Sequence, residues 1–277
     1  MNEPLPTPSP SPLEPLIETR GLSKQFDGHL AVDHVDLAIH HREIFGLIGP
    51  NGAGKSTLIK MLTTLLPATS GLARVAGFDI GRDARRVRAH IGYVPQLLSA
   101  DGALTGYENL LLSARLYLIP RRERAQRISE ALTRIGLAEA ADRLAQHYSG
   151  GMLRRLEIAQ STLHRPALLV MDEPTVGLDP LARAAVWDHV RDLRDRFGTT
   201  ILMTTHVMEE ADALCDRVGI LHRGRLARIG TPAALKAEIG AGATLDDVFA
   251  TIAGGDVDIE GSYRDVREAR RSAREHG

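Results

Sequence analysis

Short apolar runs recur along the chain and are separated by stretches in which apolar and polar residues alternate with helical spacing. Two stretches, Lys55–Leu66 and Pro180–Phe197, have that helical spacing. The short runs are the size of buried strands. They cover Ile17–Arg20, Val32–Ile39, Ile44–Ile48, Leu168–Met171, Thr200–Thr204 and Val218–Leu221. Buried strands that alternate with helices form a parallel sheet covered on both faces, so the pattern predicts an α/β fold.

The stretch from about Tyr107 to Gln146 differs, because apolar residues recur there every three or four positions and no strand-like run occurs. This spacing is typical of amphipathic helices, so we expect a helical insert between two strands of the sheet. Six of the fourteen prolines lie within residues 1–15, and this segment predicts an extended arm. The last residues, Ser262–Gly277, alternate Arg with Asp and Glu and predict a solvated helix.

Composition narrows the function classes. Apolar residues make up 43% of the 277 residues and charged residues 25%, as in ordinary globular proteins. The 34 basic and 35 acidic side chains nearly cancel, so no nucleic-acid partner is expected through a general basic field. No apolar run approaches the roughly 20 residues that span a bilayer, and no secretory signal is visible at the start. The single cysteine, Cys215, is expected to be a buried apolar residue.

A glycine-rich segment follows the strand predicted over Ile44–Ile48 and opens a helix. Its residues are Gly49, Pro50, Asn51, Gly52, Ala53, Gly54, Lys55, Ser56 and Thr57. Its glycines let backbone N–H groups turn inward toward phosphate oxygens, and the helix N-terminus adds partial positive charge. Lys55 can reach the β- and γ-phosphates, and the Ser56 hydroxyl can bind Mg²⁺. An ordinary glycine turn explains less of this arrangement, so we expect a nucleotide-phosphate site.

Two acids, Asp172 and Glu173, follow the apolar run Leu168–Met171. An acid at the end of a parallel strand lies at the sheet edge where α/β proteins bind ligands. Asp172 is suited to act on Mg²⁺, directly or through a water, and Glu173 to polarise the water that attacks the γ-phosphate. Taken alone, the two acids are equally well explained by a strand-end turn. Paired with the phosphate loop, they favour a catalytic site.

A third motif is Tyr148-Ser149-Gly150-Gly151-Met152, which precedes a predicted helix with the sequence LRRLEIAQSTLHR. One interpretation is a helix start in which Ser149 caps and the glycines make the turn. The other is a second anion site, because adjacent glycines expose backbone N–H groups at the positive end of a helix. A segment of this kind would close over the γ-phosphate from a partner molecule.

The order of the motifs resembles that of the ATP-binding-cassette (ABC) family over roughly residues 16–225. The motifs are the phosphate loop, Gln96 in GYVPQ, YSGGM, LLVMDEP, GLDP and TTH. The resemblance implies a P-loop NTPase core of α/β class with a mostly parallel sheet, an N-terminal antiparallel β portion and an inserted α-helical subdomain. It implies an ATPase domain over residues 16–240, with the helical subdomain at about 97–160 and a C-terminal helical extension over 241–277. The family's signature reads most often as LSGGQ, whereas this chain has Tyr148 and Met152 at the outer positions.

The resemblance also implies residue roles. Gln96 would sense Mg²⁺ and the attacking water, and His206 would contact the γ-phosphate as a switch. A solvated loop glutamine and a structural histidine are the alternatives. Phe26 would stack under the adenine, although a core aromatic is nearly as well supported. Asp179 would lie in the loop that joins two subunits, which is compatible with a capping acid before Pro180.

Contacts across the dimer would come from Ser149, Gly150, Gly151 and Asp179, and the Mg²⁺ ligands would be Ser56, Gln96 and Asp172. The resemblance therefore implies ATP and Mg²⁺ as cofactors and a homodimer that forms when ATP binds. Glu173, with Gln96 and His206, would be the catalytic set.

The strings YSGGM, DEPTVGLDP and TLDDVFATIAG (Thr244–Gly254) resemble the branch of ABC ATPases that drives daunorubicin-type and multidrug export. In that branch a separately encoded membrane permease holds the cargo. The expected location is cytoplasmic, peripheral on the inner face of the cell membrane, with docking between Gln96 and Gly106–Ile119. Related members that export polysaccharides, lipids or lipo-oligosaccharides remain an alternative, as does a P-loop ATPase without a transport role.

Overall fold

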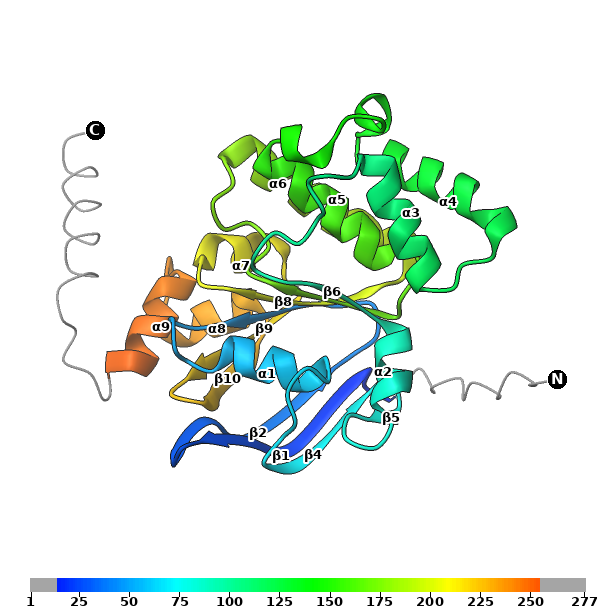
Figure 1. The fold of residues 1–277 in the computed structure, drawn as a ribbon. Coiled ribbons are helices and arrows are strands. Elements are labelled where there is room, and N and C mark those ends of the chain that lie inside the picture. The colour runs from blue at the N-terminus through cyan, green and yellow to red at the C-terminus, as the bar shows by residue number, and fades with distance from the viewer. Residues whose placement is uncertain (1–13, 255–277) are drawn as a thin grey trace, which may run out of the picture.

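The computed structural model of the protein describes residues 14–254, which fold into two β-sheets with helices around them (Figure 1). The arm predicted over residues 1–15, apart from its last two residues, lies outside the described part. The helix predicted over Ser262–Gly277 also lies outside it.

The larger sheet has six strands in the order β10-β9-β3-β8-β7-β6. β9, β3, β8, β7 and β6 are parallel to their neighbours, and β10 pairs antiparallel with β9 at one edge. The strands are β3 Ile44–Ile48, β6 Ile91–Val94, β7 Leu168–Asp172, β8 Thr200–Thr205, β9 Arg217–His222 and β10 Arg225–Gly230. A parallel sheet of this kind requires its connections to cross over as helices or longer excursions.

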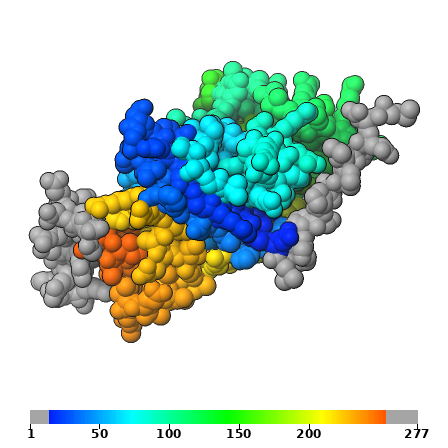
Figure 2. Space-filling view, turned by 90° about the horizontal axis from the view of Figure 1, so that it is seen from below, coloured from blue at the N-terminus to red at the C-terminus, as the bar shows by residue number. Residues whose placement is uncertain are grey.

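The smaller sheet is antiparallel and has the order β2-β1-β4-β5. Its strands are β1 Ile17–Phe26, β2 His29–Ile39, β4 Ser70–Val75 and β5 Phe78–Asp79. Seen from below, its blue N-terminal strands lie between the cyan segment and the yellow to orange C-terminal part, and β2 is in contact with β10 (Figure 2). The smaller sheet, which begins the described chain, therefore packs against the β10 edge of the larger sheet.

Helices cover both faces of the larger sheet (Figure 1). They are α1 Lys55–Leu62, α2 Ala84–His90, α3 Gly106–Leu116, α4 Arg121–Arg134, α5 Gly150–Thr162, α6 Pro180–Phe197, α7 Met208–Leu214, α8 Pro232–Ile239 and α9 Leu245–Gly254, with 3₁₀ turns at Ala138–Ala140 and Ala145–His147. No helix within residues 14–254 is long and apolar enough to cross a membrane.

Side chains of β3 point alternately to the two faces of the larger sheet and pack in two different apolar clusters. Phe45 and Leu47 pack with α1 and the smaller sheet, whereas Ile44 and Ile48 pack with α6, α7, α8 and α9. Successive side chains of a strand point to opposite faces, which explains why this five-residue strand is wholly buried. Cys215 packs in the second of these clusters, as predicted, and burial raises the pKa of its thiol.

The helical insert is confirmed, because α3, α4 and α5 lie between β6 and β7 in the chain and pack around their own apolar cluster. α3 begins at a capping box in which the Thr105 hydroxyl accepts from the Glu108 N–H and the Glu108 carboxylate accepts from the Thr105 N–H. The predicted fold class, with its mostly parallel sheet and antiparallel portion, is likewise confirmed.

Several predicted boundaries were wrong. The helix expected over Lys55–Leu66 ends at Leu62, because Thr64 takes a left-handed φ of 62° that breaks the helical path. The helix after YSGGM begins at Gly150 and ends at Thr162. The first two predicted strands form part of the antiparallel sheet, as the family resemblance implied, whereas the strand pattern alone had placed them with the parallel strands. Strands β4, β6 and β10 were missed, since they are short or carry polar and glycine residues in their runs.

Candidate active site

The carboxyl ends of four neighbouring parallel strands meet at one edge of the larger sheet. β3 leads into the glycine-rich loop, β8 ends before His206, β7 ends at Asp172, and β6 leads to Gln96. The pairing holds these ends level, since Ile48 lies opposite Thr205 and Asp172 opposite Thr204. Residues that are far apart in the sequence therefore converge at the position where open α/β sheets bind ligands.

The glycine-rich loop turns tightly between β3 and α1. Gly54, at the N-terminal cap of α1, has a φ of 104°, and a Cβ atom there would lie 2.2 Å from the Ala31 carbonyl oxygen. Only glycine fits that combination of left-handed backbone and close approach. Asn51 and Gly52 are exposed, Ala53 is buried, and Pro50, Ser56 and Thr57 are half-buried. The loop therefore presents its backbone at the N-terminus of α1, where partial positive charge favours anions.

Lys55 is the buried cation of this loop, with 5% of its surface exposed. Its ammonium donates to the carbonyl oxygens of Gly49 at 2.7 Å and Pro50 at 3.1 Å, and it lies 3.7 Å from Glu173 Oε1. Burial lowers the pKa of Lys55, and the carboxylates of Glu173 and Asp172 oppose that shift. A phosphate bound in the loop would form a strong charge-assisted hydrogen bond with this ammonium.

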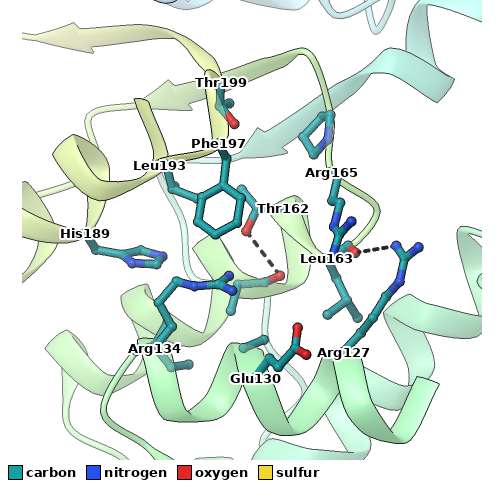
Figure 3. A pocket seen from close by; sticks show the side chains of 14 residues that line it. Arg127, Glu130, Arg134, Thr162, Leu163, Arg165, His189, Leu193, Phe197 and Thr199 are labelled. Atoms are coloured by element: carbon teal, nitrogen blue, oxygen red, sulfur yellow. Dashed lines mark hydrogen bonds between the residues drawn. The ribbon is translucent and has the colours of Figure 1, made fainter. Parts of the chain in front are cut away.

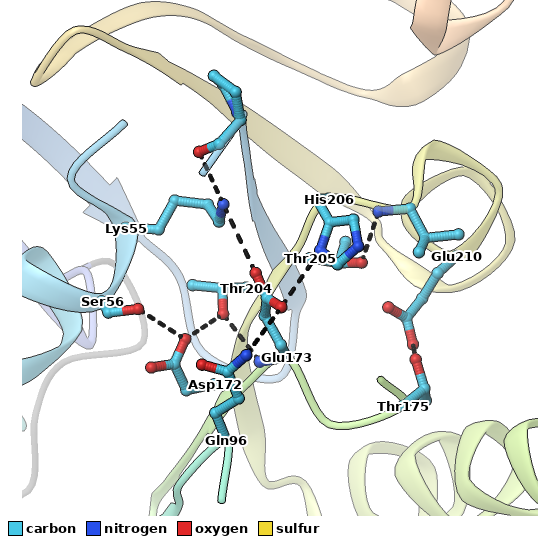
Figure 4. A network of polar contacts seen from close by, with 12 residues as sticks. Lys55, Ser56, Gln96, Asp172, Glu173, Thr175, Thr204, Thr205, His206 and Glu210 are labelled. Carbon is cyan, nitrogen blue, oxygen red and sulfur yellow. Dashed lines mark hydrogen bonds and ion pairs between the residues drawn. The ribbon is translucent and has the colours of Figure 1, made fainter. Parts of the chain in front are cut away.

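Asp172 faces the start of α1. Its Oδ1 accepts from the Ser56 hydroxyl at 3.3 Å and from the Thr204 hydroxyl at 2.6 Å (Figure 4). A hydroxyl and a carboxylate oxygen that converge in this way are hard oxygen donors of the kind Mg²⁺ prefers. Ser56 and Asp172 therefore fit a Mg²⁺ bound with a nucleotide, and such an ion would neutralise charge on the phosphates.

Glu173 lies at the centre of the polar network in Figure 4. Its Oε1 faces Lys55, and its Oε2 lies 3.2 Å from His206 Nδ1 and 3.4 Å from Gln96 Nε2. The residue has a φ of 49°, which is rare for a non-glycine residue and costs of order 1–3 kcal/mol. Its backbone N–H is held by the Thr204 hydroxyl at 2.9 Å. The structure thus brings Lys55, Gln96 and His206 to one carboxylate, an arrangement that can orient a water for attack on a phosphate.

Thr204 is a residue that sequence reasoning missed in this role. It is fully buried, and its one hydroxyl donates to Asp172 and accepts from the Glu173 N–H. The signal in the sequence is a threonine at the end of an otherwise apolar strand, two residues before His206. Its partners become visible only when β7 and β8 are paired.

Glu210 was also missed. Its buried carboxylate on α7 accepts from the Thr175 hydroxyl at 2.7 Å and from Trp187 Nε1 at 3.0 Å. It therefore fastens the segment after Glu173 to α6 and to the helix that follows His206 (Figure 4).

The predicted trans-subunit residues form a separate group at two helix starts. Ser149 caps α5 by accepting from the Met152 N–H at 3.3 Å, and Asp179 caps α6 by accepting from the Ala182 N–H at 2.8 Å. A Cβ atom on Gly151 would lie 2.6 Å from the Ala182 Cβ, so the two helix starts pack closely. Ser149, Gly150 and Asp179 are exposed. Within residues 14–254, no hydrogen bond or ion pair joins this group to the glycine-rich loop.

Phe26 lies at the end of β1, opposite His29 in the hairpin with β2. Its ring is 43% exposed, which excludes the alternative of a core aromatic. The Lys24 ammonium lies 5.0 Å from the ring centroid. The same hairpin contacts the glycine-rich loop through Ala31, so Phe26 is available as a stacking surface near the loop.

A cavity of about 100 Å³ lies away from this site, between α4, the end of α5 and α6 (Figure 3). Arg134 on its wall lies 4.4 Å from the centroid of the Phe197 ring. Burial, assisted by the positive charge of Arg134, lowers the pKa of His189 to about 4. None of the predicted site residues lines this cavity.

Comparison with known proteins gives the family. Residues 32–176 match the family model described as ABC transporter. The chain is 47% identical over 224 residues to the daunorubicin/doxorubicin resistance ATP-binding protein DrrA of Streptomyces peucetius, a match that covers 81% of this chain and 68% of that protein. It is 42% identical over 219 residues to the Nod factor export ATP-binding protein I of Sinorhizobium fredii (strain NBRC 101917 / NGR234), covering 79% of this chain and 64% of that protein.

The fold is also similar to a solved structure titled "Structure of ATP binding subunit of ABC transporter". The TM-score is 0.77 at 31% identity, and the match covers 85% of this chain and 98% of that one. The family model, the sequence identity and the similarity of fold therefore all indicate the same family.

The variant Thr204→Val tests the buried hydroxyl. It leaves the Glu173 N–H unpaired and removes a donor from Asp172, so we expect a stability loss of about 1–3 kcal/mol. Because both acids would shift, ATP hydrolysis per folded molecule should fall about tenfold or more. Thermal unfolding and a steady-state ATPase assay measure the two effects.

The matched control is Thr200→Val, at another fully buried threonine of β8. Its hydroxyl accepts from the Arg42 N–H at 2.8 Å and touches no site residue. This control should lose comparable stability and retain its hydrolysis rate. Equal rates in the two variants would show that Thr204 has only a structural role.

Proposed function

The chain belongs to the ABC transporter family, and we propose that it is the ATP-hydrolysing subunit of an export system that powers a separate membrane permease. In this proposal residues 16–240 are the ATPase domain, with the helical subdomain at about 97–160. Of the C-terminal helical extension expected over 241–277, α9 packs against the larger sheet, and residues 255–277 lie outside the described part. The protein acts in the cytoplasm at the inner face of the membrane, held there by the permease.

One observation carries the catalytic part of this proposal: the Glu173 carboxylate faces Lys55, Gln96 and His206 at the edge of the parallel sheet. The phosphate loop and Lys55 bind the ATP phosphates, and Ser56, Asp172 and Gln96 hold Mg²⁺. Glu173 acts as the general base on a water that Gln96 and His206 help to orient. Phe26 stacks on the adenine.

A composite site explains the second group of residues. Ser149, Gly150 and Asp179 are exposed at two adjacent helix starts that leave the chain's own phosphate loop untouched. Such exposed N-termini suit the γ-phosphate of an ATP held by another copy. We therefore propose a homodimer, formed when ATP binds, in which each site combines one phosphate loop with the partner's Ser149–Gly151 and Asp179.

The cargo assignment rests on the relatives. One is named for daunorubicin/doxorubicin resistance at 47% identity, which favours export of a drug-like or lipophilic compound. The Nod factor export protein at 42% identity supports a lipo-oligosaccharide as the second candidate. Cargo would be held by the permease in either case.

Exposed apolar side chains support a docking surface for the permease on the helical insert. Leu97 is 82% exposed directly after Gln96, and Leu116 on α3 is 72% exposed. Leu98, Leu112, Tyr117 and Leu118 are exposed as well. Large exposed apolar side chains on both of these stretches, 97–98 and 112–118, are a feature of interaction sites.

The variant Glu173→Gln tests the assignment of Glu173 as the general base. Loss of a positioned general base costs about 10²–10⁴ in rate, whereas the ligands of ATP and Mg²⁺ remain. The variant should accumulate as an ATP-bound dimer, which light scattering with ATP detects. Glu108→Gln, in the capping box of α3, is the control and should hydrolyse ATP at the unchanged rate. A Glu173→Gln protein that stays monomeric with unimpaired turnover contradicts the assignment.

Mixing two inactive variants tests the composite site. Lys55→Ala breaks the phosphate loop and keeps the signature segment, whereas Ser149→Arg keeps the loop and blocks the signature with bulk. Each homodimer should be nearly inactive. A mixed dimer contains one site with both halves intact, so ATPase activity should return in part after subunit exchange.

A control variant is needed to separate two roles of Ser149, the cap of α5 and the contact with ATP in the partner's site. Ser149→Ala removes the hydroxyl that caps α5, which is worth about 1 kcal/mol, and adds no bulk. Its unfolding temperature therefore shows how much of the Ser149→Arg effect is loss of stability. No restoration after verified exchange would favour a helix cap as the whole role of Ser149.

Charged substitutions test the docking surface. Leu97→Asp combined with Leu116→Asp should reduce recovery in the membrane fraction of cells that express the permease, with ATP hydrolysis by the purified protein unchanged. Leu72→Asp is the control, because Leu72 is 63% exposed on β4, in the other sheet. Equal recovery of both variants, or equal recovery with and without the permease, would contradict this surface.

A further inference from the structure

A buried ion pair on α5 contacts the segment that carries Gln96. Arg154 and Glu157 lie one turn apart, with side chains that are 3% and 2% exposed and 3.0 Å between Arg154 Nη1 and Glu157 Oε2. Neither residue belongs to the motifs of the ATP site. Buried ions are retained only where partners satisfy them, so the rest of their contacts show what the pair holds.

All of the remaining contacts reach the loop after β6. Arg154 donates to the carbonyl oxygen of Pro95 from Nη1 and of Gln96 from Nη2, each at 2.7 Å. Glu157 Oε1 accepts from the Ser99 N–H, from the Ser99 hydroxyl at 3.0 Å and from the Ala100 N–H at 3.3 Å. The guanidinium thus holds the loop from one side of Gln96 and the carboxylate from the other.

The chain is also fastened to β6 at the C-terminal end of this helix and just beyond it. The Ser161 hydroxyl donates to the Tyr93 carbonyl oxygen at 2.9 Å, and His164 Nε2 lies 3.1 Å from the Ile91 carbonyl oxygen. Gly92 allows this approach, because a Cβ atom there would lie 2.1 Å from the Ser161 carbonyl oxygen. Displacement of α5 would therefore disturb its hydrogen bonds to the Gln96 segment and to β6.

We propose that Arg154 and Glu157 are positioning residues that couple Gln96 to the N-terminus of α5, and so link each ATP site to the site that the same subunit completes in its partner. The coupling rests on the composite site proposed above. Gln96 serves the subunit's own phosphate loop, whereas Ser149, five residues before Arg154, serves the partner's loop. One rigid helix with a planar, bidentate clamp at its side transmits a shift at either end.

The mixed dimer provides the test, because it has one working site. The Ser149→Arg subunit supplies the phosphate loop, Gln96 and Glu173 of that site, and its own signature is already blocked. Glu157→Gln is added to this subunit. The amide keeps an oxygen for the backbone donors and loses the charge that faces Arg154. Hydrolysis should fall about tenfold or more, since a small misplacement of Gln96 is enough for such a loss.

The second placement distinguishes coupling from simple support of α5. Glu157→Gln in the Lys55→Ala subunit, which supplies the signature, should also lower hydrolysis. A loss only in this second placement would mean that Glu157 supports α5 alone, and it would overturn the proposal. Full activity in both placements would overturn it as well.

Control variants account for folding. Glu123→Gln removes another Glu–Arg pair of the helical insert, in which Arg127 Nη2 lies 2.8 Å from Glu123 Oε2 and no atom touches the Gln96 loop. It should leave the mixed dimer unchanged. Arg154→Lys keeps the buried charge and cannot reach both carbonyls in one plane, so it should reproduce the loss if Glu157→Gln fails to fold. ATP binding to each single subunit should be unchanged within about twofold.

The parent pair separates the two proposals. If Lys55→Ala and Ser149→Arg restore no activity after verified exchange, the composite site is wrong and the coupling falls with it. If they restore activity that Glu157→Gln and Arg154→Lys do not lower in the loop-supplying subunit, the coupling alone is wrong.

Discussion

The site depends on charges that are buried together at the edge of a parallel sheet. Lys55, Asp172 and Glu173 are each less than a tenth exposed, and an isolated ion in that position would cost several kcal/mol. Their proximity offsets this cost, because the Lys55 ammonium lies 3.7 Å from the Glu173 carboxylate and is also attracted by Asp172, and both acids stand at the end of β7. The position of the strands therefore determines the position of the charges, and a bound phosphate enters a site whose polar groups are already arranged.

Backbone strain and a buried hydroxyl complete that arrangement. Glu173 has a left-handed backbone, and Thr204 from the neighbouring strand holds its N–H. Strain of this kind persists only where surrounding contacts over-determine it. Glu210 extends the restraint by joining the segment after Glu173 to α6 and α7. Glu173 is thus held by contacts from several elements, and not by its own loop alone.

Polar groups of the helical insert connect it to the Gln96 loop. Most of its apolar side chains pack in a cluster of their own, whereas Ile158 of α5 packs in the cluster of the larger sheet that contains Ile44 and Ile48. Arg154 and Glu157 connect it to the loop of Gln96, and exposed leucines cover part of its outer surface. The insert is therefore joined to the Gln96 loop and to β6 by several polar contacts, which is the connection that the proposed coupling requires.

The sequence by itself determined the features that depend on local chemistry. Gly49–Thr57 follows a strand and opens a helix, and its glycines, lysine and serine act within one turn of chain, so the phosphate loop was predicted from its own residues. Asp172 and Glu173 were predicted as acids at the end of an apolar strand, and Gln96 and His206 from the resemblance in motif order. Only the tertiary structure decided how they meet, because the strand order β3-β8-β7-β6 is not written in any one segment. The same reason explains the misses: Thr204, Glu210, Arg154 and Glu157 are buried polar residues. Apart from the contact between Arg154 and Glu157, their partners lie 23 to 59 positions away on other elements or loops. A buried polar group indicates that a hydrogen-bond partner exists. The pairing of distant strands and helices determines which residue that partner is.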